Sequence, residues 1–147
     1  MNPYIHTVQY YETDKMGVTH HSNYIRFMEE ARVSFLRGIG WDYGRLEEQG
    51  VISPVVSVNC RYIKPSRFAD EIAVYISVAD ISRARLVIDY DMKLGGETIC
   101  TAQSVHCFVT ESGKPLNIQK SYPEFFSALL TLKEAAADTA AHGAGGD

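Results

Sequence analysis

The spacing of apolar positions in the first third of the chain predicts a strand followed by a long helix. The stretch YIHTVQYY, from Tyr4 to Tyr11, is β-branched and aromatic, which is typical of a strand. In NYIRFMEEARVSFLRGIG, residues 23–40, apolar side chains recur at helical spacing, and the pattern stops near Gly38 and Gly40. The segment WDYGRLEEQG then predicts a short helix or turn.

In the next part of the chain the apolar period becomes two, which predicts four strands. They are residues 55–63, 71–78, 84–94 and 97–110. The links between them, such as DISRA and LGGE, are short, so consecutive strands should pair antiparallel. A terminal helix over residues 122–136 should begin at Ser121 and Pro123. Residues 135–147 lack core-forming side chains, which predicts a disordered tail after one domain of residues 1–134.

The first predicted helix is apolar around most of its circumference, which indicates that it is mostly buried. Its apolar side consists of Tyr24, Phe27, Met28, Ala31 and Phe35, widened by Ile25 and Leu36, against a narrow polar face of Arg26, Glu30 and Arg37. One small sheet cannot cover such a helix completely, and its edges stay open. The pattern therefore favours a sheet curled around the helix and a homodimer or homotetramer that covers the rest.

Arg32 lies inside this apolar arc. Burying an arginine alone is costly, so we expect it to pair with Glu29, one turn before it, or with a neighbouring subunit. The alternative is an exposed ion pair on the helix surface, which would contribute only tenths of a kcal/mol.

Composition narrows the function. The chain has 147 residues, a formal net charge of -4 and a pI of about 5.7, which suits one domain and argues against nucleic-acid binding. The three cysteines, Cys60, Cys100 and Cys107, form no CxxC pair, and the start shows no basic-then-apolar signal region. These features predict a reducing, cytoplasmic setting. No apolar run approaches the ~20 residues of a membrane-spanning helix, so no membrane span is expected.

The segment ETDKMGVTHHSNY, residues 12–24, places an acid and two histidines directly before the long helix. Backbone N–H groups at a helix start are unpaired and carry the positive end of the helix dipole. They could stabilise the negative charge that develops on an attacked carbonyl oxygen. Asp14 stands seven residues before His21 and could attack that carbonyl or activate water. Gly17 would let the backbone turn between the two.

Each of these residues also has a structural interpretation. Asp14 could be only a turn residue, and Ser22 or Asn23 could be the helix cap. His20 and His21 could be ordinary loop histidines, or one of them could orient water or Asp14. A zinc site is not expected, because adjacent side chains diverge and no second His/Cys pair stands at metal spacing.

Two longer motifs resemble the hotdog-fold acyl-CoA thioesterases. They are YETDKMGVTHHSNYIRFMEEAR and RYIKPSRFADEIAV, and the resemblance extends from Val8 to Phe126. It is nearest to the 4-hydroxybenzoyl-CoA thioesterase-like branch, which includes the Tol-Pal-associated acyl-CoA thioesterases. This resemblance implies an α+β hotdog fold, with an antiparallel sheet of about five strands wrapped around a central helix and followed by a C-terminal helix. It also implies a homodimer or homotetramer.

The resemblance assigns chemistry to the loop before the helix. It maps the catalytic aspartate onto Asp14 and the backbone N–H that polarises the thioester carbonyl onto His21, with Gly17 and His20 beside them. An acyl-CoA substrate is implied, hydrolysed without a cofactor or metal. Residues expected to contact it are Tyr24, Asn23, Arg61, Lys64 and Arg67, with Arg83 and Arg85 as further candidates for the phosphates.

Alternative functions remain open on the same scaffold. A hotdog dehydratase or hydratase would place an Asp/His pair for proton transfer at carbon, which His20 and His21 keep in consideration. A non-catalytic acyl-CoA-binding module would tolerate loss of Asp14. Another hotdog thioesterase branch uses a glutamate on the helix, so Glu29 and Glu30 are alternatives to Asp14.

Overall fold

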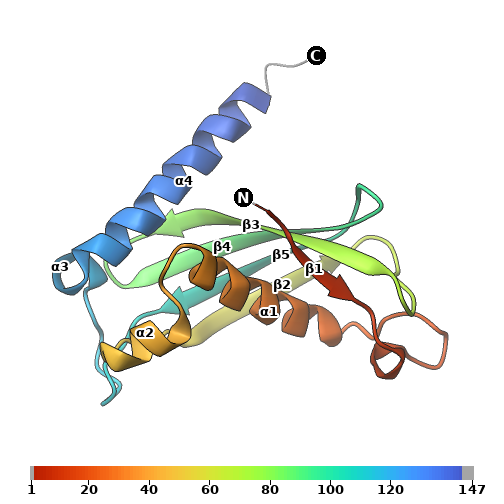
Figure 1. The fold of residues 1–147 in the computed structure, drawn as a ribbon, viewed down its shortest axis with the longest axis horizontal. Coiled ribbons are helices and arrows are strands. Elements are labelled where there is room, and N and C mark those ends of the chain that lie inside the picture. Colours follow the sequence, from red (N-terminus) through yellow and green to blue (C-terminus); the bar gives the residue numbers. More distant parts are fainter. Residues whose placement is uncertain (1, 144–147) are drawn as a thin grey trace.

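One antiparallel sheet of five strands lies against a long helix, α1, that crosses one of its faces (Figure 1). The computed structural model describes residues 2–143, with side chains described through residue 138. The strands are β1 (Tyr4–Thr7), β2 (Val55–Tyr62), β3 (Glu71–Ile81), β4 (Arg85–Leu94) and β5 (Glu97–Cys107); the helices are α1 (Asn23–Gly38), α2 (Tyr43–Glu48), α3 (Ile118–Ser121) and α4 (Pro123–Gly143). The predicted α+β arrangement is confirmed.

The strand order is β1-β3-β4-β5-β2, and every neighbouring pair is antiparallel. β3, β4 and β5 are consecutive hairpins, as their short links predict. The prediction that consecutive strands pair is wrong for β2 and β3: among the described strands β2 pairs only with β5, so it forms one edge of the sheet, and β1 forms the other. α1 follows β1 and precedes β2, so the chain carries it from one edge of the sheet toward the other.

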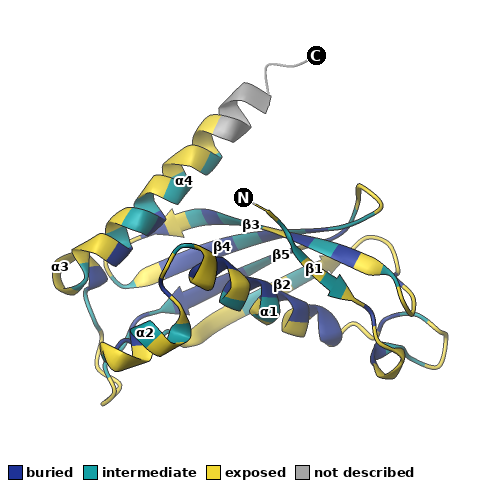
Figure 2. Cartoon of the chain, viewed as in Figure 1, coloured by how far each residue is buried: buried dark blue, intermediate teal, exposed yellow. Residues whose placement is uncertain are grey.

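The core lies between the sheet and the inner face of α1, where buried residues concentrate in Figure 2. Phe27 and Met28 of α1 pack there with Ile72, Ile88 and Met92 of the sheet. On the outer side of α1, Ile25 of the predicted apolar side is 46% exposed. The other apolar residues predicted for its buried side are all buried, so the prediction of a buried central helix is confirmed; they are Tyr24, Phe27, Met28, Ala31, Phe35 and Leu36.

The first strand is shorter than predicted. β1 ends at Thr7, and a 3₁₀ turn, η1 (Tyr10–Glu12), replaces the predicted continuation to Tyr11. The Gln9 backbone N–H donates to the Glu12 carboxylate over 2.7 Å, and the Glu12 N–H donates back to the Gln9 carbonyl over 3.0 Å. This reciprocal cap ends the strand. β5 likewise ends at Cys107 instead of Thr110.

The C-terminal helix is longer than predicted. Phe125 and Leu129 anchor α4 in the core, and the helix continues to Gly143 and projects beyond the sheet (Figure 1). The predicted disordered tail therefore differs from the structure over residues 135–143. Alanine has the highest helix propensity, so this Ala-rich segment can extend a helix without a core contact. The rest of the predicted tail, residues 144–147, lies outside the described residues.

Arg32 is buried but does not pair as predicted. Its Nη1 lies 2.7 Å from Nδ1 of His106, and its guanidinium lies 5.6 Å from the centre of the Tyr43 ring. Among the described residues no ion pair joins Arg32 to Glu29. The neutral imidazole satisfies a guanidinium N–H instead. The other ring nitrogen of His106 lies 2.7 Å from the hydroxyl of Ser104, which extends this buried polar chain.

Candidate active site

The loop between η1 and α1 is held from both sides. Val18 and Arg67 form an antiparallel bridge, and the Thr19 N–H donates to the Ser66 carbonyl over 2.8 Å. Gly17 has a φ of 79°, a left-handed conformation that glycine adopts without strain. The loop is thereby fixed against the connection between β2 and β3.

Asp14 is a turn residue that uses one of its two carboxylate oxygens for the turn. Its Oδ1 accepts hydrogen bonds from the backbone N–H groups of Met16 (2.9 Å) and Val18 (3.3 Å). No hydrogen bond to Oδ2 occurs among the described residues, so that oxygen is available to a substrate or water. The structural and chemical interpretations of Asp14 are therefore compatible, because each uses a different carboxylate oxygen.

The start of α1 leaves one backbone donor free. The N–H groups of Asn23 and Tyr24 donate to the carbonyls of His20 and His21, over 3.0 and 3.3 Å. The Ser22 N–H lies 3.3 Å from Nδ1 of His20. The His21 N–H has no acceptor in the part of the chain that the structure describes. This free donor stands at the positive end of the helix dipole, where it suits a developing negative charge.

Asp14 and His21 line one cavity of about 480 Å³. Its walls are Asp14, Val18, Thr19, His21, Tyr24, Tyr62, Ile63, Lys64 and Pro65. The cavity thus brings together four residues that the sequence predicts for the site: Asp14, His21, Tyr24 and Lys64. It is large enough for the reacting part of a small-molecule substrate.

Tyr62 and Thr19 are site residues that the sequence analysis missed. The Tyr62 hydroxyl donates to the His21 carbonyl over 3.0 Å, and its ring centre lies 5.3 Å from that of Tyr24. Burial, together with nearby Cys60, raises the pKa of Tyr62 to about 12, so its hydroxyl remains a donor at neutral pH. Tyr62 belongs to the apolar-facing set of β2, and that alternation was the available signal for it.

Hydroxyl groups of two residues that line the cavity, Thr19 and Tyr24, both contact the hydroxyl of Ser66. The Ser66 hydroxyl lies 2.6 Å from that of Thr19 and 2.8 Å from that of Tyr24, and Ser66 is fully buried. Burial raises the pKa of Tyr24, although its bond to Ser66 acts in the opposite direction. Tyr24 therefore serves as a neutral, fixed wall of the cavity.

Two predicted site residues point elsewhere. The Asn23 side chain is buried and donates to the Glu12 carbonyl over 2.9 Å, so it anchors the loop and does not line the cavity. Neither it nor Ser22 caps the helix with a side-chain bond. Nδ1 of His20 lies 2.8 Å from the Ser22 hydroxyl, and its ring stacks on His21. His20 therefore does not form the Asp/His pair that a dehydratase would need.

The predicted basic residues do not form one cluster. Lys64 lines the cavity and forms an ion pair with Glu97, whereas Arg61 and Arg67 are exposed outside its lining. Arg85 pairs with Cys107 at one end of β5, while Tyr62 pairs with Cys100 seven residues away. At about 3.3 Å per residue, Arg85 and neighbouring Arg83 lie at the far end of the sheet from this cavity.

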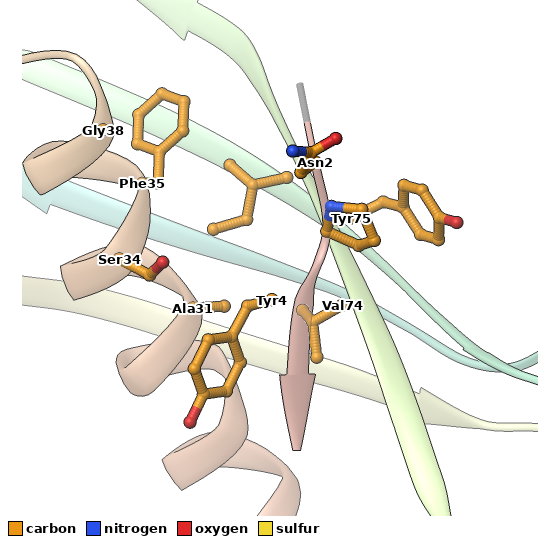
Figure 3. A pocket seen from close by; sticks show the side chains of 10 residues that line it. Asn2, Tyr4, Ala31, Ser34, Phe35, Gly38, Val74 and Tyr75 are labelled. Atoms are coloured by element: carbon orange, nitrogen blue, oxygen red, sulfur yellow. The ribbon is translucent and has the colours of Figure 1, made fainter.

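A second cavity, of about 310 Å³, lies between α1 and the strands β1 and β3 (Figure 3). Ala31, Phe35 and Val74 contribute apolar walls, and Ser34 lies beside them. None of the residues predicted for catalysis lines it. Glu29 belongs to a third, small cavity beside Arg32, so it does not share a cavity with Asp14.

The described residues were also compared with what a metal site and a membrane span require. Within residues 2–143, no group of three or more His, Cys, Asp or Glu side chains is arranged to hold a metal ion. No helix of this part of the chain is long and apolar enough to cross a membrane.

Known proteins are similar to this chain in sequence and in fold. A family model described as the thioesterase-like superfamily matches residues 8–130. The Bacillus subtilis protein YneP, provisionally named an acyl-CoA thioesterase, is 35% identical over 129 residues, covering 86% of this chain and 94% of YneP. A 1,4-dihydroxy-2-naphthoyl-CoA hydrolase of Thermosynechococcus vestitus is 30% identical over 113 residues, 72% of this chain and 77% of the relative. The solved DHNA-CoA thioesterase from Staphylococcus aureus has a TM-score of 0.87 at 28% identity, covering 94% of each chain.

Proposed function

Since this chain belongs to the thioesterase-like superfamily of hotdog proteins and is a thioester hydrolase, we propose that it hydrolyses an acyl-CoA to the free acid and coenzyme A. The observation that carries the proposal is that Asp14 and His21 line the same cavity, and that among the described residues Oδ2 of Asp14 and the His21 backbone N–H have no hydrogen-bond partner. That the chain belongs to the branch with the Tol-Pal-associated acyl-CoA thioesterases stays a prediction.

The cavity supports a two-sided mechanism. The thioester carbonyl oxygen accepts the His21 N–H, where the helix dipole stabilises the negative charge of the tetrahedral intermediate. On the other side Asp14 takes a proton from the water that attacks the carbonyl carbon, or attacks that carbon itself to form an anhydride that water then cleaves. In both cases the C–S bond breaks, and coenzyme A leaves as a thiolate that takes up a proton. Neither course needs a metal or cofactor.

Lys64 suits the coenzyme end of the substrate. It stands in the cavity lining beside Pro65, and its side chain is 53% exposed, so its ammonium group can reach a phosphate at the rim. Its partner Glu97 is also exposed, and an exposed ion pair is weak enough to exchange for a phosphate. Arg61 and Arg67 lie in the same segment and remain candidates for a second contact.

We propose a homodimer as the minimal assembly. β2 is an edge strand, and among the described strands it has only one partner. Val55, Val56 and Ile25 expose apolar surface along that edge and the adjacent face of α1. A second copy, placed antiparallel across a two-fold axis, would pair the two edges and cover this surface. Sedimentation that shows a stable, active monomer at micromolar concentration would refute this.

The three free cysteines support the cytoplasmic location that the sequence predicts.

The Asp14→Asn variant tests the mechanism. Asparagine keeps an Oδ1 acceptor for the Met16 and Val18 N–H groups but removes the charge. We expect an unchanged fold, unchanged substrate binding and a loss in kcat of at least ~10²-fold. Asp42→Asn is the matched control, because the Asp42 carboxylate accepts the Arg45 N–H over 2.8 Å at another helix start. Near-normal turnover in a folded Asp14→Asn protein would exclude Asp14 as base or nucleophile.

A further inference from the structure

His6 of β1 lies between two carboxylates directly behind the active-site loop. Its Nε2 is 2.8 Å from Oε1 of Glu12, and its Nδ1 is 3.0 Å from Oε2 of Glu30. The His6 side chain is 11% exposed and that of Glu12 only 4%. These three residues, called the His6 cluster below, take no part in the mechanism above.

The His6 ring contacts two carboxylates at once, and this arrangement is called the clamp below. A neutral imidazole has one N–H and can donate to only one of the two carboxylates, so the doubly protonated ring is the form that satisfies both. The ring also stacks on Phe27 of α1, with centres 4.0 Å apart. The Tyr4 hydroxyl donates to the same Glu30 oxygen over 2.8 Å. Burial and the neighbouring Glu30 raise the pKa of Tyr4 to about 12, so this hydroxyl stays a donor.

Glu12 connects the His6 cluster to both halves of the site. Its carboxylate also accepts the Gln9 N–H, which fixes the turn that leads into the loop. Its backbone carbonyl accepts the His20 N–H over 2.8 Å and the Asn23 side-chain amide over 2.9 Å. His20 immediately precedes the free His21 N–H, and Asp14 follows Glu12 by two residues. A shift of Glu12 would therefore move the acid and the oxyanion donor together.

We infer that His6 is a positioning residue for thioester hydrolysis, which acts through Glu12 on Asp14 and the His21 N–H, with Glu30 fixing the ring to α1. Glu30 comes from the helix whose start forms the oxyanion site, and Glu12 comes from the turn that precedes the acid. The ring of His6 thus sets the relation between the two elements that must converge on one carbonyl. This inference rests on the proposed function.

His6→Gln and Glu30→Gln test it through the split between kcat and KM. His6→Gln replaces the ring that contacts both carboxylates, whereas Glu30→Gln removes the charge from one of the two contacts, and each variant keeps a neutral hydrogen-bonding group. Because small displacements of catalytic groups reduce rate steeply, kcat should fall about tenfold for His6→Gln and less for Glu30→Gln. KM should change by less than about twofold, because neither residue lines the cavity. Asp80→Asn, which removes an exposed carboxylate paired with Lys133 at 3.0 Å, is the control and should leave both constants unchanged.

A double variant separates positioning from general loss of stability. If His6 acts through Asp14, then His6→Gln should cost little further rate in an Asp14→Asn background, whereas a purely structural loss would multiply with it. Multiplied losses, or a fall in kcat matched by an equal rise in KM, would overturn the inference. If His6→Gln fails to fold, the same comparison with Glu30→Gln decides.

Hydrogen exchange gives a readout that does not depend on activity. The His20 amide should exchange faster in His6→Gln than in the wild type, because its acceptor is the Glu12 carbonyl, and Asp80→Asn should leave it unchanged. Faster exchange in a protein that hydrolyses no acyl-CoA from an aromatic, short-chain and long-chain panel would uphold the clamp and reject the proposed function. Unchanged exchange at His20 would overturn the clamp whatever the activity.

Discussion

Acidification should destabilise the protein through His106. This side chain is almost fully buried, and its Nδ1 lies 2.7 Å from Nη1 of Arg32. Burial, and secondarily the Arg32 charge, lower the pKa of His106 from 6.5 to about 4. The neutral ring accepts from Arg32 and donates to the Ser104 hydroxyl. Protonation would replace that acceptor with a second donor facing a cation.

The magnitude follows from the two pKa values. The unfolded chain takes up the proton near pH 6.5 and the folded chain only near pH 4, so the unfolded state binds more protons between these values. Stability is therefore fully present above pH 6.5 and falls as the pH decreases toward 4. The difference, 6.5 minus 4, at 1.36 kcal/mol per unit corresponds to about 3 kcal/mol.

Urea unfolding at pH 7, 5.5 and 4 measures this effect when the wild type is compared with His106→Gln. Glutamine can accept from Arg32 through its carbonyl oxygen, but it does not titrate. Between pH 7 and pH 4 the wild type should lose about 3 kcal/mol more free energy of unfolding than the variant. Protein concentration must be held constant, because an oligomer's stability depends on it. Equal losses in the two proteins would refute the assignment of a buried neutral His106 beside Arg32.

Three further predictions concern a thiol, the rim and the core. A hydrogen bond with Cys100 lowers the pKa of Cys60 to about 7, so the rate at which iodoacetamide alkylates Cys60 should be half-maximal near pH 7. Mass spectrometry measures this rate, with Cys60→Ser as the control, and a midpoint above about 8.5 would contradict the prediction. Lys64→Glu should raise KM more than it lowers kcat, and added salt should reduce this rise in KM. The exposed control Lys114→Glu should leave KM unchanged, and equal KM values for the two variants would remove Lys64 from the phosphate site. Leu129→Ala should cost about 2–5 kcal/mol in chemical unfolding because Leu129 is fully buried, and a loss below about 1 kcal/mol would mean that α4 does not anchor the core.

The central strands could be predicted because their information is local. Ile72, Val74 and Val78 share one face of the strand, and short links dictate hairpins, so β3 to β5 follow from period and turn length. The end of β1 could not, because the aromatic stretch continues past Thr7. A hydrogen bond between Gln9 and Glu12 sets where the strand ends, and strand propensity does not predict such a cap.

The site shows the same division. Asp14 and His21 lie within one short segment, so the motif and its resemblance could place both of them in the cavity. Tyr62 reaches the site through tertiary structure, because the end of β2 lies beside the loop although 41 residues separate Tyr62 from His21. Asn23 was misassigned because an amide next to a helix start suits a ligand as well as a backbone carbonyl. Only the position of the Glu12 carbonyl distinguishes the two.

The placement of β1 and β2 at opposite edges of the sheet also sets the order in which a growing polypeptide can assemble. The segment with Asp14 leaves the ribosome before its partners Ser66 and Arg67, which are made some 50 residues later. β2, which carries Tyr62, has β5 as its neighbour, so it stays unattached until synthesis passes Cys107. The hairpins of β3 to β5 close short loops and should form first. The residues proposed for catalysis, although encoded before β2 to β5, should thus be the last to reach their positions.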